Sequence, residues 1–382
     1  MLIYLDNNAT TRVADEVLDA MEPFYREFYG NPHSPHALGR RSQDAIELAR
    51  EQVASLVSAA TEEIYFTSCG TESNALVIRG CVGHDGRKKI VTTSVEHPSV
   101  LALLRALESD GQIKLVTVPV NRRGEIDLRA MDQAIDETTA LVTVMLAQNE
   151  TGVVHPVAEI AVMAHRNGAR LHVDAVQAAG KIPIHAGDLD ADFLSISGHK
   201  FHAPKGIGAL FVRRGISIPP LWYGGGQEYG MRSGTEAVPS IVGLGAASEL
   251  ALARMELQQQ VERLRDRFES IVLSGTTLAS VNGSGARLPN TSNISFSGIN
   301  AGRLVFMLDR SGLCASGGSA CQSSKPEPSA VMTAMGVPVE QAAGAIRFSL
   351  SRYTTADEIE QATPIILNAI ATLTESPQPA SA

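Results

Sequence analysis

The sequence predicts an α/β fold in which a large domain with a mostly parallel seven-stranded sheet is joined to a smaller α+β C-terminal domain. In the first two-thirds of the chain, short apolar runs alternate with amphipathic, helix-like stretches. The runs are rich in β-branched residues and apolar along their length, which is typical of strands buried on both faces of a parallel sheet. At 382 residues, the chain is too long for one ordinary core and suits two domains.

Seven apolar runs are strand candidates. They lie at residues 63–67, 89–93, 113–118, 141–146, 169–173, 193–197 and 209–212. Helix-like segments between strands lie at residues 73–82, 99–109, 128–136 and 157–166. A helix between two strands carries the chain back across the sheet, so the strands that it joins are expected to be parallel.

The last third of the chain follows a different pattern. Residues 237–273 contain few helix breakers and are predicted to form one long connecting helix. The alternating pattern then restarts at residues 293–296, 301–308, 313–315 and 346–350, and a final helix runs from 356 to about 373. We expect a large domain at residues 15–255, a small domain formed by 1–14 with 256–375, and a flexible tail at 376–382 (PQPASA follows Ser376).

Composition narrows the class of protein. A net charge of −9 and a pI near 5.6 argue against a general nucleic-acid or anionic-membrane surface, since both favour a basic face. The four cysteines are far apart and form no C-x-x-C pair, which indicates free thiols in a reducing compartment. The sequence has no evident signal peptide and no window near the 18 or so apolar residues of a membrane span, so we expect a cytoplasmic protein.

Lys200 is the first candidate catalytic residue. The segment FLSISGHKFHAPKGIGAL places it directly after an apolar strand, where open α/β sheets bind ligands. Partial burial there would lower the pKa of the amine and make it a nucleophile toward an aldehyde. The competing Lys205 lies between Pro204 and Gly206 and is better explained as a turn residue.

Three further motifs at strand ends suit a pyridoxal-phosphate site. In HVDAVQ, Asp174 could keep a pyridine nitrogen protonated, and Gln177 could donate to the phenolic oxygen O3′. In CGTESN, Gly70 and Thr71 open a helix whose free N–H groups could hold a phosphate. In SVEHPSV, His97 could lie over the ring. Singly, Lys200 is also explained as a loop charge, the turn at Gly70 and Thr71 as a helix cap, and His97 as a structural histidine. Only their combination, each at a strand end, favours the cofactor.

The motifs together resemble those of the NifS/IscS-like cysteine desulfurases, in the fold-type-I, class-V aminotransferase group. The resemblance runs from residue 4 to about residue 360 and includes YLDNNATT, FTSCGTESN, EHPSV, QNETGVVHP, HVDAVQ, SGHKFHAPKGIGAL, GGGQEYGMRSGT, SGGSACQSS and IRFSLSRYTT. It implies the pyridoxal-phosphate-dependent transferase fold of type I. The implied activity converts L-cysteine to L-alanine through an external aldimine with the cofactor.

The resemblance also implies a role for each matching position. The implied cofactor ligands are Gly70, Thr71, His97, Asn149, Asp174, Gln177, Ser197, His199, Lys200 and, from the other subunit of a homodimer, Thr235. Lys200 would be the Schiff-base lysine, and His97 a second catalytic group. Arg347, with Asn149 beside it, would grip the substrate carboxylate through a bidentate guanidinium fork.

Cys321 is the candidate sulfur acceptor of the chain itself. It lies in ASGGSACQSSKPEPS, where small residues would leave the loop mobile, as a thiol that carries sulfur must be. The resemblance implies that Cys321 receives the sulfur as a persulfide and passes it to an acceptor protein such as an iron–sulfur scaffold. Burial would suit the other three cysteines better: Cys69, Cys81 and Cys314.

Alternatives remain within and outside this family. Gln148 replaces the usual asparagine of Asn-Asn-Glu, and His155 replaces the usual glutamine before Pro156, which leaves the subfamily and the acceptor open. An aminotransferase or a selenocysteine lyase would share the fold, as would a catalytically inactive scaffold for an assembly partner. A metallohydrolase could draw on His172, Asp174, His199 and His202, but these lack a further clustered pair, and we expect no metal site.

Overall fold

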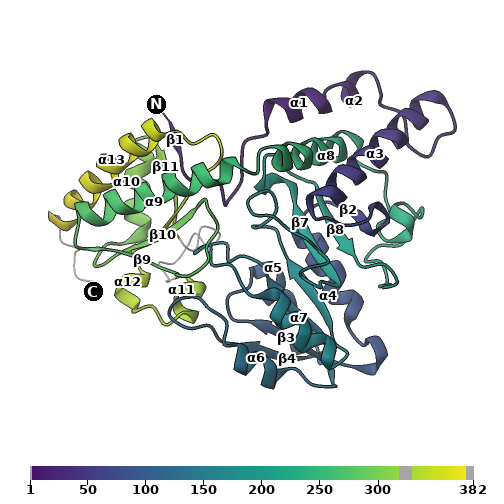
Figure 1. Cartoon of the computed structure of the whole chain (residues 1–382), viewed down its shortest axis with the longest axis horizontal. Coiled ribbons are helices and arrows are strands. Elements are labelled where there is room, and N and C mark those ends of the chain that lie inside the picture. Colours follow the sequence, from purple (N-terminus) through teal and green to yellow (C-terminus); the bar gives the residue numbers. More distant parts are fainter. Residues whose placement is uncertain (1, 318–328, 376–382) are drawn as a thin grey trace.

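A computed structural model describes residues 2–317 and 329–375, which form two lobes (Figure 1). The large lobe contains one seven-stranded sheet, and its strands are the seven predicted from the sequence. They are β2 (Ile64–Thr67), β3 (Lys89–Thr93), β4 (Lys114–Val118), β5 (Thr139–Met145), β6 (Arg170–Asp174), β7 (Phe193–Ser197) and β8 (Gly208–Val212). The spatial order is β2-β8-β7-β6-β5-β3-β4, and only β8 runs antiparallel to its neighbours. The predicted mostly parallel sheet is therefore confirmed.

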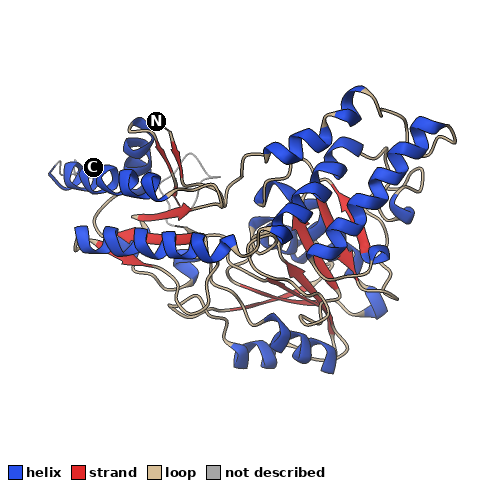
Figure 2. Cartoon of the chain, turned by 45° about the horizontal axis from the view of Figure 1, so that its top comes forward, coloured by secondary structure: helices blue, strands red, loops and turns tan. Residues whose placement is uncertain are grey.

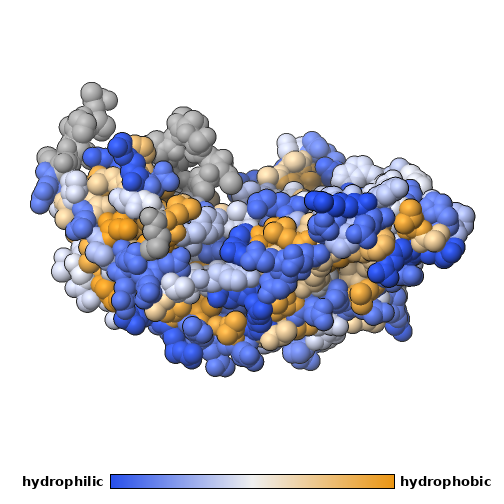
Figure 3. Space-filling view, turned by 90° about the horizontal axis from the view of Figure 1, so that it is seen from above, coloured by the Kyte–Doolittle hydropathy of each residue, from blue (hydrophilic) through white to orange (hydrophobic). Residues whose placement is uncertain are grey.

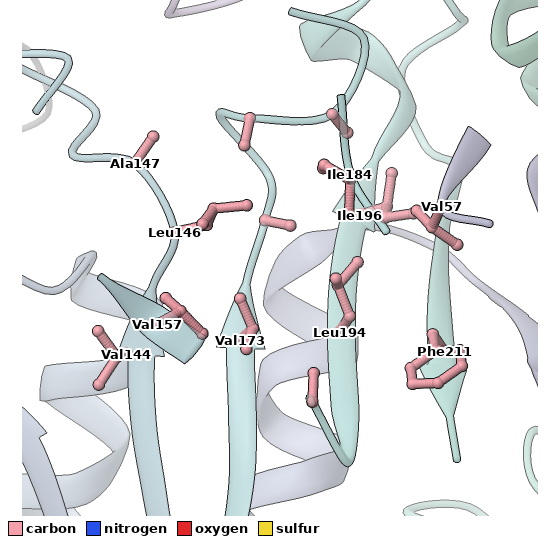
Figure 4. Packing of buried hydrophobic residues seen from close by; sticks show 14 of the residues in the cluster. Val57, Val144, Leu146, Ala147, Val157, Val173, Ile184, Leu194, Ile196 and Phe211 are labelled. Carbon is pink, nitrogen blue, oxygen red and sulfur yellow. The ribbon is translucent and has the colours of Figure 1, made fainter. Parts of the chain in front are cut away.

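The strands are rich in apolar residues because hydrophobic clusters cover both faces of the sheet. Neighbouring residues alternate between two hydrophobic clusters: Ile90, Leu141, Phe193 and Leu210 face one, and Val91, Val142, Leu194 and Phe211 face the other. Figure 4 shows side chains of the second cluster on adjacent strands, with Val144, Val173, Leu194 and Phe211 pointing to one side. Successive side chains of a strand point to opposite faces, and here hydrophobic clusters cover both faces of the sheet.

Helices enclose the strands of the large lobe (Figure 2). One face is covered by α4 (Gly70–Cys81) and α5 (Pro98–Ser109). The other is covered by α7 (Val157–Arg166) together with α1 (Asp15–Met21), α3 (Ala37–Leu56) and α8 (Val238–Ala253). The short helices α2 (Pro23–Arg26) and α6 (Leu128–Ala134) complete the lobe.

The predicted continuous helix at residues 237–273 is wrong. The chain forms two helices, α8 and α9 (Leu257–Gly275), with a turn between them at residues 254–256. The two helices belong to different surroundings: α8 packs on α3 in the large lobe, whereas Val261, Leu264 and Phe268 of α9 enter the core of the small lobe. Because no glycine or proline marks the turn, the change of packing partner is the physical reason for the break.

The small lobe is built on a four-stranded antiparallel sheet. Its order is β12 (Ser316–Gly317), β13 (Ala345–Ser349), β10 (Thr291–Phe296) and β9 (Ala279–Val281). The N-terminal β1 (Ile3–Tyr4) pairs in parallel with β11 (Leu313–Cys314), so the first residues of the chain join its last third. Helices α9, α10 (Ala301–Arg310) and α13 (Ala356–Glu375) pack with these strands around a separate core.

Two short helices lie between β12 and β13 in the sequence and pack against the core of the large lobe. These are α11 (Ala330–Ala334) and α12 (Val339–Ala342). Val331, Met332 and Met335 pack in the cluster that covers the large sheet, although their positions fall in the predicted small domain. The exact limits of the two domains stay a prediction. In the described part of the chain, no helix is long and apolar enough to cross a membrane.

Candidate active site

One pocket opens at the carboxyl ends of β5, β6 and β7, where the sheet meets the start of α4. It encloses about 650 Å³ of empty space, part of it open to solvent. The pocket is lined by all nine same-chain cofactor ligands that were predicted: Gly70, Thr71, His97, Asn149, Asp174, Gln177, Ser197, His199 and Lys200. Asp174 and Lys200 therefore lie on the same side of the sheet, as a shared ligand requires. Further lining residues, which the sequence analysis did not assign, include Cys69, Asn74, Ser99, Met145 and Val176.

Asp174 ends β6 and is held in place by two donors. Its side chain is 5% exposed. Asn74 Nδ2 donates to Oδ2 at 2.8 Å, and the backbone N–H of Val176 donates to Oδ1 at 3.0 Å. Hydrogen bonds to a carboxylate favour its ionised form. The sequence analysis did not assign Asn74 to the site, although it lies one helical turn after Gly70 in the same CGTESN motif.

The first turn of α4 forms a confined cradle beside this carboxylate. The helix begins at Gly70, as predicted, so its first backbone N–H groups have no partner within the helix. A Cβ atom at residue 70 would lie 2.6 Å from Cγ2 of Val176, which leaves no room for a side chain. Ser197 and His199 border the same pocket from the end of β7. The turn can therefore bring backbone donors close to an anion.

Burial lowers the pKa of both histidines in the pocket, which favours their neutral form. Burial, with the neighbouring Lys200, lowers the pKa of His199 to about 4. Burial also lowers the pKa of His97, and Lys200 adds to this effect whereas Asp174 opposes it. His97 caps α5 by accepting the backbone N–H of Ser99 at Nδ1, at 3.1 Å. Its proton consequently lies on Nε2.

Lys200 lies at the end of a short 3₁₀ turn (Gly198–Lys200) that follows β7. Its Nζ donates to the backbone carbonyls of Asn8 at 2.6 Å and Ala9 at 3.0 Å. Gln177 Nε2 donates to the same Asn8 carbonyl at 3.0 Å. The N-terminal segment is thus part of the site. The sequence analysis noted its motif YLDNNATT but assigned no role to it.

Arg347 approaches the site from β13 of the small lobe. It is 8% exposed and donates from Nη1 to the backbone carbonyl of Asn149 at 3.1 Å. Its Nη2 forms an ion pair with Asp6 Oδ1 at 2.9 Å. The guanidinium group therefore lies beside the loop that brings Asn149 to the pocket, where it can meet a small carboxylate.

Two predicted residues are not part of this pocket as described. Thr235 is exposed and does not line the pocket of its own chain, so its contribution to a second subunit stays a prediction. Cys321 lies outside the described residues. Of the other cysteines, Cys81 is buried as expected, whereas Cys69 and Cys314 are only half-buried. Cys69 lines the pocket, and Cys314 lies in the short strand β11 beside the fully buried Leu313.

The residues of the metal-site alternative are not assembled. His172 is fully buried, and its ring nitrogens contact Thr143 Oγ1 at 2.8 Å and Ser195 Oγ at 2.9 Å. His202 Nδ1 contacts the backbone carbonyl of Arg12 at 3.0 Å. Within residues 2–317 and 329–375, no group of three histidine, cysteine or acidic side chains could hold a metal ion. The metallohydrolase reading has no support in this geometry.

Comparison with known proteins places nearly the whole chain in one family. The model of the class-V aminotransferases matches residues 3–362. A cysteine desulfurase of Trichormus azollae is 49% identical over 363 residues, and the cysteine desulfurase NifS of Azotobacter vinelandii is 46% identical, each match covering 94% of this chain and 90% of the relative. A solved NifS-like protein has a TM-score of 0.92 at 38% identity, covering 98% of this chain and 100% of its own, and SspA in complex with cysteine has 0.82 at 34%, covering 92% and 99%. The chain therefore belongs to the class-V aminotransferase family, among the NifS-like cysteine desulfurases with the type I fold of pyridoxal-phosphate enzymes.

Proposed function

We propose that this protein is a pyridoxal-phosphate-dependent cysteine desulfurase, which converts L-cysteine to L-alanine and retains the sulfur as a persulfide on Cys321. The observation that carries the proposal is the single pocket that joins the amine of Lys200, the buried carboxylate of Asp174 and the first turn of α4. Relatives that share nearly half of the sequence are cysteine desulfurases by name, and one similar structure is described as a complex with cysteine.

The residues present fit pyridoxal phosphate. Lys200 would bond to the aldehyde and Asp174 would face the ring nitrogen, with His97 over the ring and Gln177 beside the phenolic oxygen. The cradle at Gly70 and Thr71, with Ser197, His199 and the Thr235 of a second subunit, would hold the phosphate. The fit is supported by the space at Gly70, which a Cβ would fill, and by the two donors that hold the Asp174 carboxyl group in place. When bound, the cofactor withdraws electrons from the α-carbon of the substrate through its protonated ring.

The chain's own groups would then divide the work. Arg347 would bind the substrate carboxylate, in exchange for or beside its present partner Asp6. Lys200 would remove the α-proton and return a proton later. His97, whose Nδ1 accepts the backbone N–H of Ser99, could donate the proton on its Nε2 to a leaving group.

Sulfur transfer would follow at the substrate thiol. The Cys321 thiolate would attack the substrate sulfur, forming an S–S bond while the C–S bond breaks. The electron pair of that bond stays on the carbon skeleton, which becomes alanine after protonation. The reaction needs no outside oxidant, because one carbon is reduced as one sulfur is oxidised to the persulfide level.

We also propose a homodimer that passes its sulfur to an acceptor protein, such as an iron–sulfur scaffold, in the cytoplasm. Large exposed aromatic side chains lie near Thr235 in sequence: Trp222, Tyr223 and Tyr229 are 52%, 83% and 69% exposed. Interfaces are enriched in such residues. On the face shown in Figure 3, by contrast, hydrophobic residues lie in separate patches among hydrophilic ones.

The test combines a visible spectrum with mass measurement. Purified protein supplied with pyridoxal phosphate should absorb as a lysine-bound cofactor, change on addition of L-cysteine, and release alanine while Cys321 gains one sulfur atom. Lys200→Ala should lose the cofactor signal that borohydride fixes, and Cys321→Ser should bind cysteine without forming a persulfide. Cys314→Ser is the matched control and should behave as wild type. Undiminished alanine turnover by Cys321→Ser would refute the role of Cys321, and a 2-oxo acid in place of alanine would favour an aminotransferase.

A further inference from the structure

Lys181 is a buried lysine at the back of the site with no assigned role. It is 6% exposed, and among the described residues it has no carboxylate partner. Its Nζ donates instead to two side-chain amide oxygens, Gln177 Oε1 at 2.8 Å and Asn8 Oδ1 at 2.9 Å. A buried amine without an acid is costly, so its retention calls for a function. Burial holds the pKa of Lys181 well below its ordinary value, and Lys200 and Arg347 lower it further.

The contacts of Lys181 determine which way the amide of Gln177 faces. The Lys181 amine donates to Gln177 Oε1, so the amide presents its oxygen to Lys181. The other end of the same amide lies 3.0 Å from the Asn8 carbonyl, which can only accept, so that end must be the nitrogen. Two independent neighbours therefore fix one orientation. The nitrogen carries two hydrogens, and Asn8 takes one of them, which leaves the second for the pocket that Gln177 lines.

Lys181 orients Asn8 by the same logic. Asn8 Oδ1 accepts from Lys181 and from Asn290 Nδ2 at 2.9 Å. Asn8 Nδ2 is then free to donate to Thr291 Oγ1 at 2.8 Å and to the backbone carbonyl of Asn149 at 3.3 Å. The Asn8 carbonyl that receives Gln177 and Lys200 is held in place by this network.

We propose that Lys181 is a positioning residue for the cofactor, which locks the amide of Gln177 so that its N–H, and never its oxygen, faces the phenolic oxygen of pyridoxal phosphate. This inference rests on the proposed function. Without Lys181, only the Asn8 carbonyl would still hold the amide, so the orientation that turns its oxygen toward the negatively charged oxygen would become more populated. The phenolic oxygen would then hold the proton of the neighbouring nitrogen more tightly, because no donor would share its charge.

The experiment measures the pH midpoint of the visible absorbance of the lysine-bound cofactor, in protein supplied with pyridoxal phosphate. Lys181→Met should raise this midpoint by roughly 0.5 to 1 pH unit. The shift is smaller than the full effect of losing a hydrogen bond to a charged group, because the amide of Gln177 remains in place. Cofactor release should become roughly 10-fold faster, which corresponds to about one such unit. The other charged and titratable groups that face the site remain in place: Asp174, His97, His199, Lys200 and Arg347.

A double-mutant cycle separates orientation from simple charge. Removing a positive charge could also raise the midpoint, but that effect would persist when Gln177 is replaced. In the Gln177→Leu background, Lys181→Met should therefore cause no further shift. Lys89→Met is the matched control, since Lys89 is also a buried lysine but pairs with Asp136 at 2.7 Å away from this pocket; its midpoint should equal that of wild type.

The outcomes are distinct from those of the proposed function. If wild-type protein gives no cofactor absorbance, the proposed function fails. If wild type absorbs normally but Lys181→Met titrates at the same pH, or if its shift persists in Gln177→Leu, the role of Lys181 is overturned. Lys181→Gln, which is neutral and polar, takes the same place in the cycle if Lys181→Met does not fold.

Discussion

Glu228 is the residue whose replacement should most clearly weaken the loop that leads to Thr235. It forms a bidentate pair with Arg50, at 2.7 Å and 2.9 Å, and each side chain is 3% exposed. It also accepts the backbone N–H of Phe66 at 2.7 Å, at the edge strand β2. Glu228 and Tyr229 both have positive φ angles, of 48° and 53°. Residues other than glycine rarely adopt this backbone conformation, so surrounding contacts must hold it in place.

Glu228→Gln keeps the shape of the side chain and removes its charge. Breaking one half of a buried ion pair costs about 3–5 kcal/mol, and an amide that keeps some hydrogen bonds should fall at the lower end, about 3 kcal/mol. That loss is a large share of the free energy of unfolding, which is about 5–15 kcal/mol for proteins of ordinary stability. Replacing both partners, as in Arg50→Met with Glu228→Leu, should cost less than Glu228→Gln, because no charge is left buried alone.

Urea unfolding measures the effect, and the single tryptophan of the chain, Trp222, lies six positions before Glu228 and reports on this loop. The matched control is Glu62→Gln, since Glu62 pairs with Arg214 at the surface, where the side chains are 57% and 69% exposed. The control should change the free energy of unfolding by less than about 1 kcal/mol. A loss below about 1 kcal/mol for Glu228→Gln, equal to the control, would refute the reasoning.

Three further predictions concern titration, space and thiol chemistry. Burial raises the pKa of Glu96 to about 8, so the folded protein keeps a proton that the unfolded chain releases near pH 4.3, and the free energy of unfolding falls as pH rises between these values. Glu96→Gln should therefore be more stable than wild type at pH 8 but not at pH 4. Thermal melts in which the two proteins change in parallel across this pH range would contradict this. Gly70→Ala should weaken pyridoxal-phosphate binding at least about 10-fold, because the new Cβ would press on Val176, and an unchanged dissociation constant in equilibrium dialysis would exclude the cradle. Burial raises the pKa of Cys81 to about 11, so a thiol reagent should label it only after urea unfolding, as peptide masses would reveal; labelling of the native protein would disprove its burial.

The strands of the large sheet were the most predictable part of the fold. Runs such as 89–93 and 193–197 agree with β3 and β7 at both ends, because a strand that is buried on both faces is a nearly continuous run of apolar and β-branched residues with small polar ones. The very short strands β1, β9 and β12 were not predicted, since two or three residues are too few to show a period. The strands β9 and β12 pair with the edges of the longer neighbours β10 and β13, whereas β1 pairs with the equally short β11.

The residues of the candidate pocket that the sequence analysis assigned are those that lie at the ends of strands or helices. Lys200, Asp174 and Gly70 each follow or precede a recognisable strand or helix, and the ends of parallel strands necessarily meet at one edge. Asn74 and Lys181 carry no such local mark. Their importance depends on which side chains face them, namely Asp174 and Gln177.

The sequence by itself determined the seven-stranded sheet, the family and the chemical groups of the pocket, because period, strand ends and motifs are local properties of the chain. Only the tertiary structure decided that residues 237–273 divide into two helices, and that Asn8, Gln177, Lys181 and Asn290 form one hydrogen-bonded network. The reason is physical. A helix breaks where its two halves gain more from different cores than from continuity, and a buried polar group is oriented by whichever distant donors and acceptors close around it.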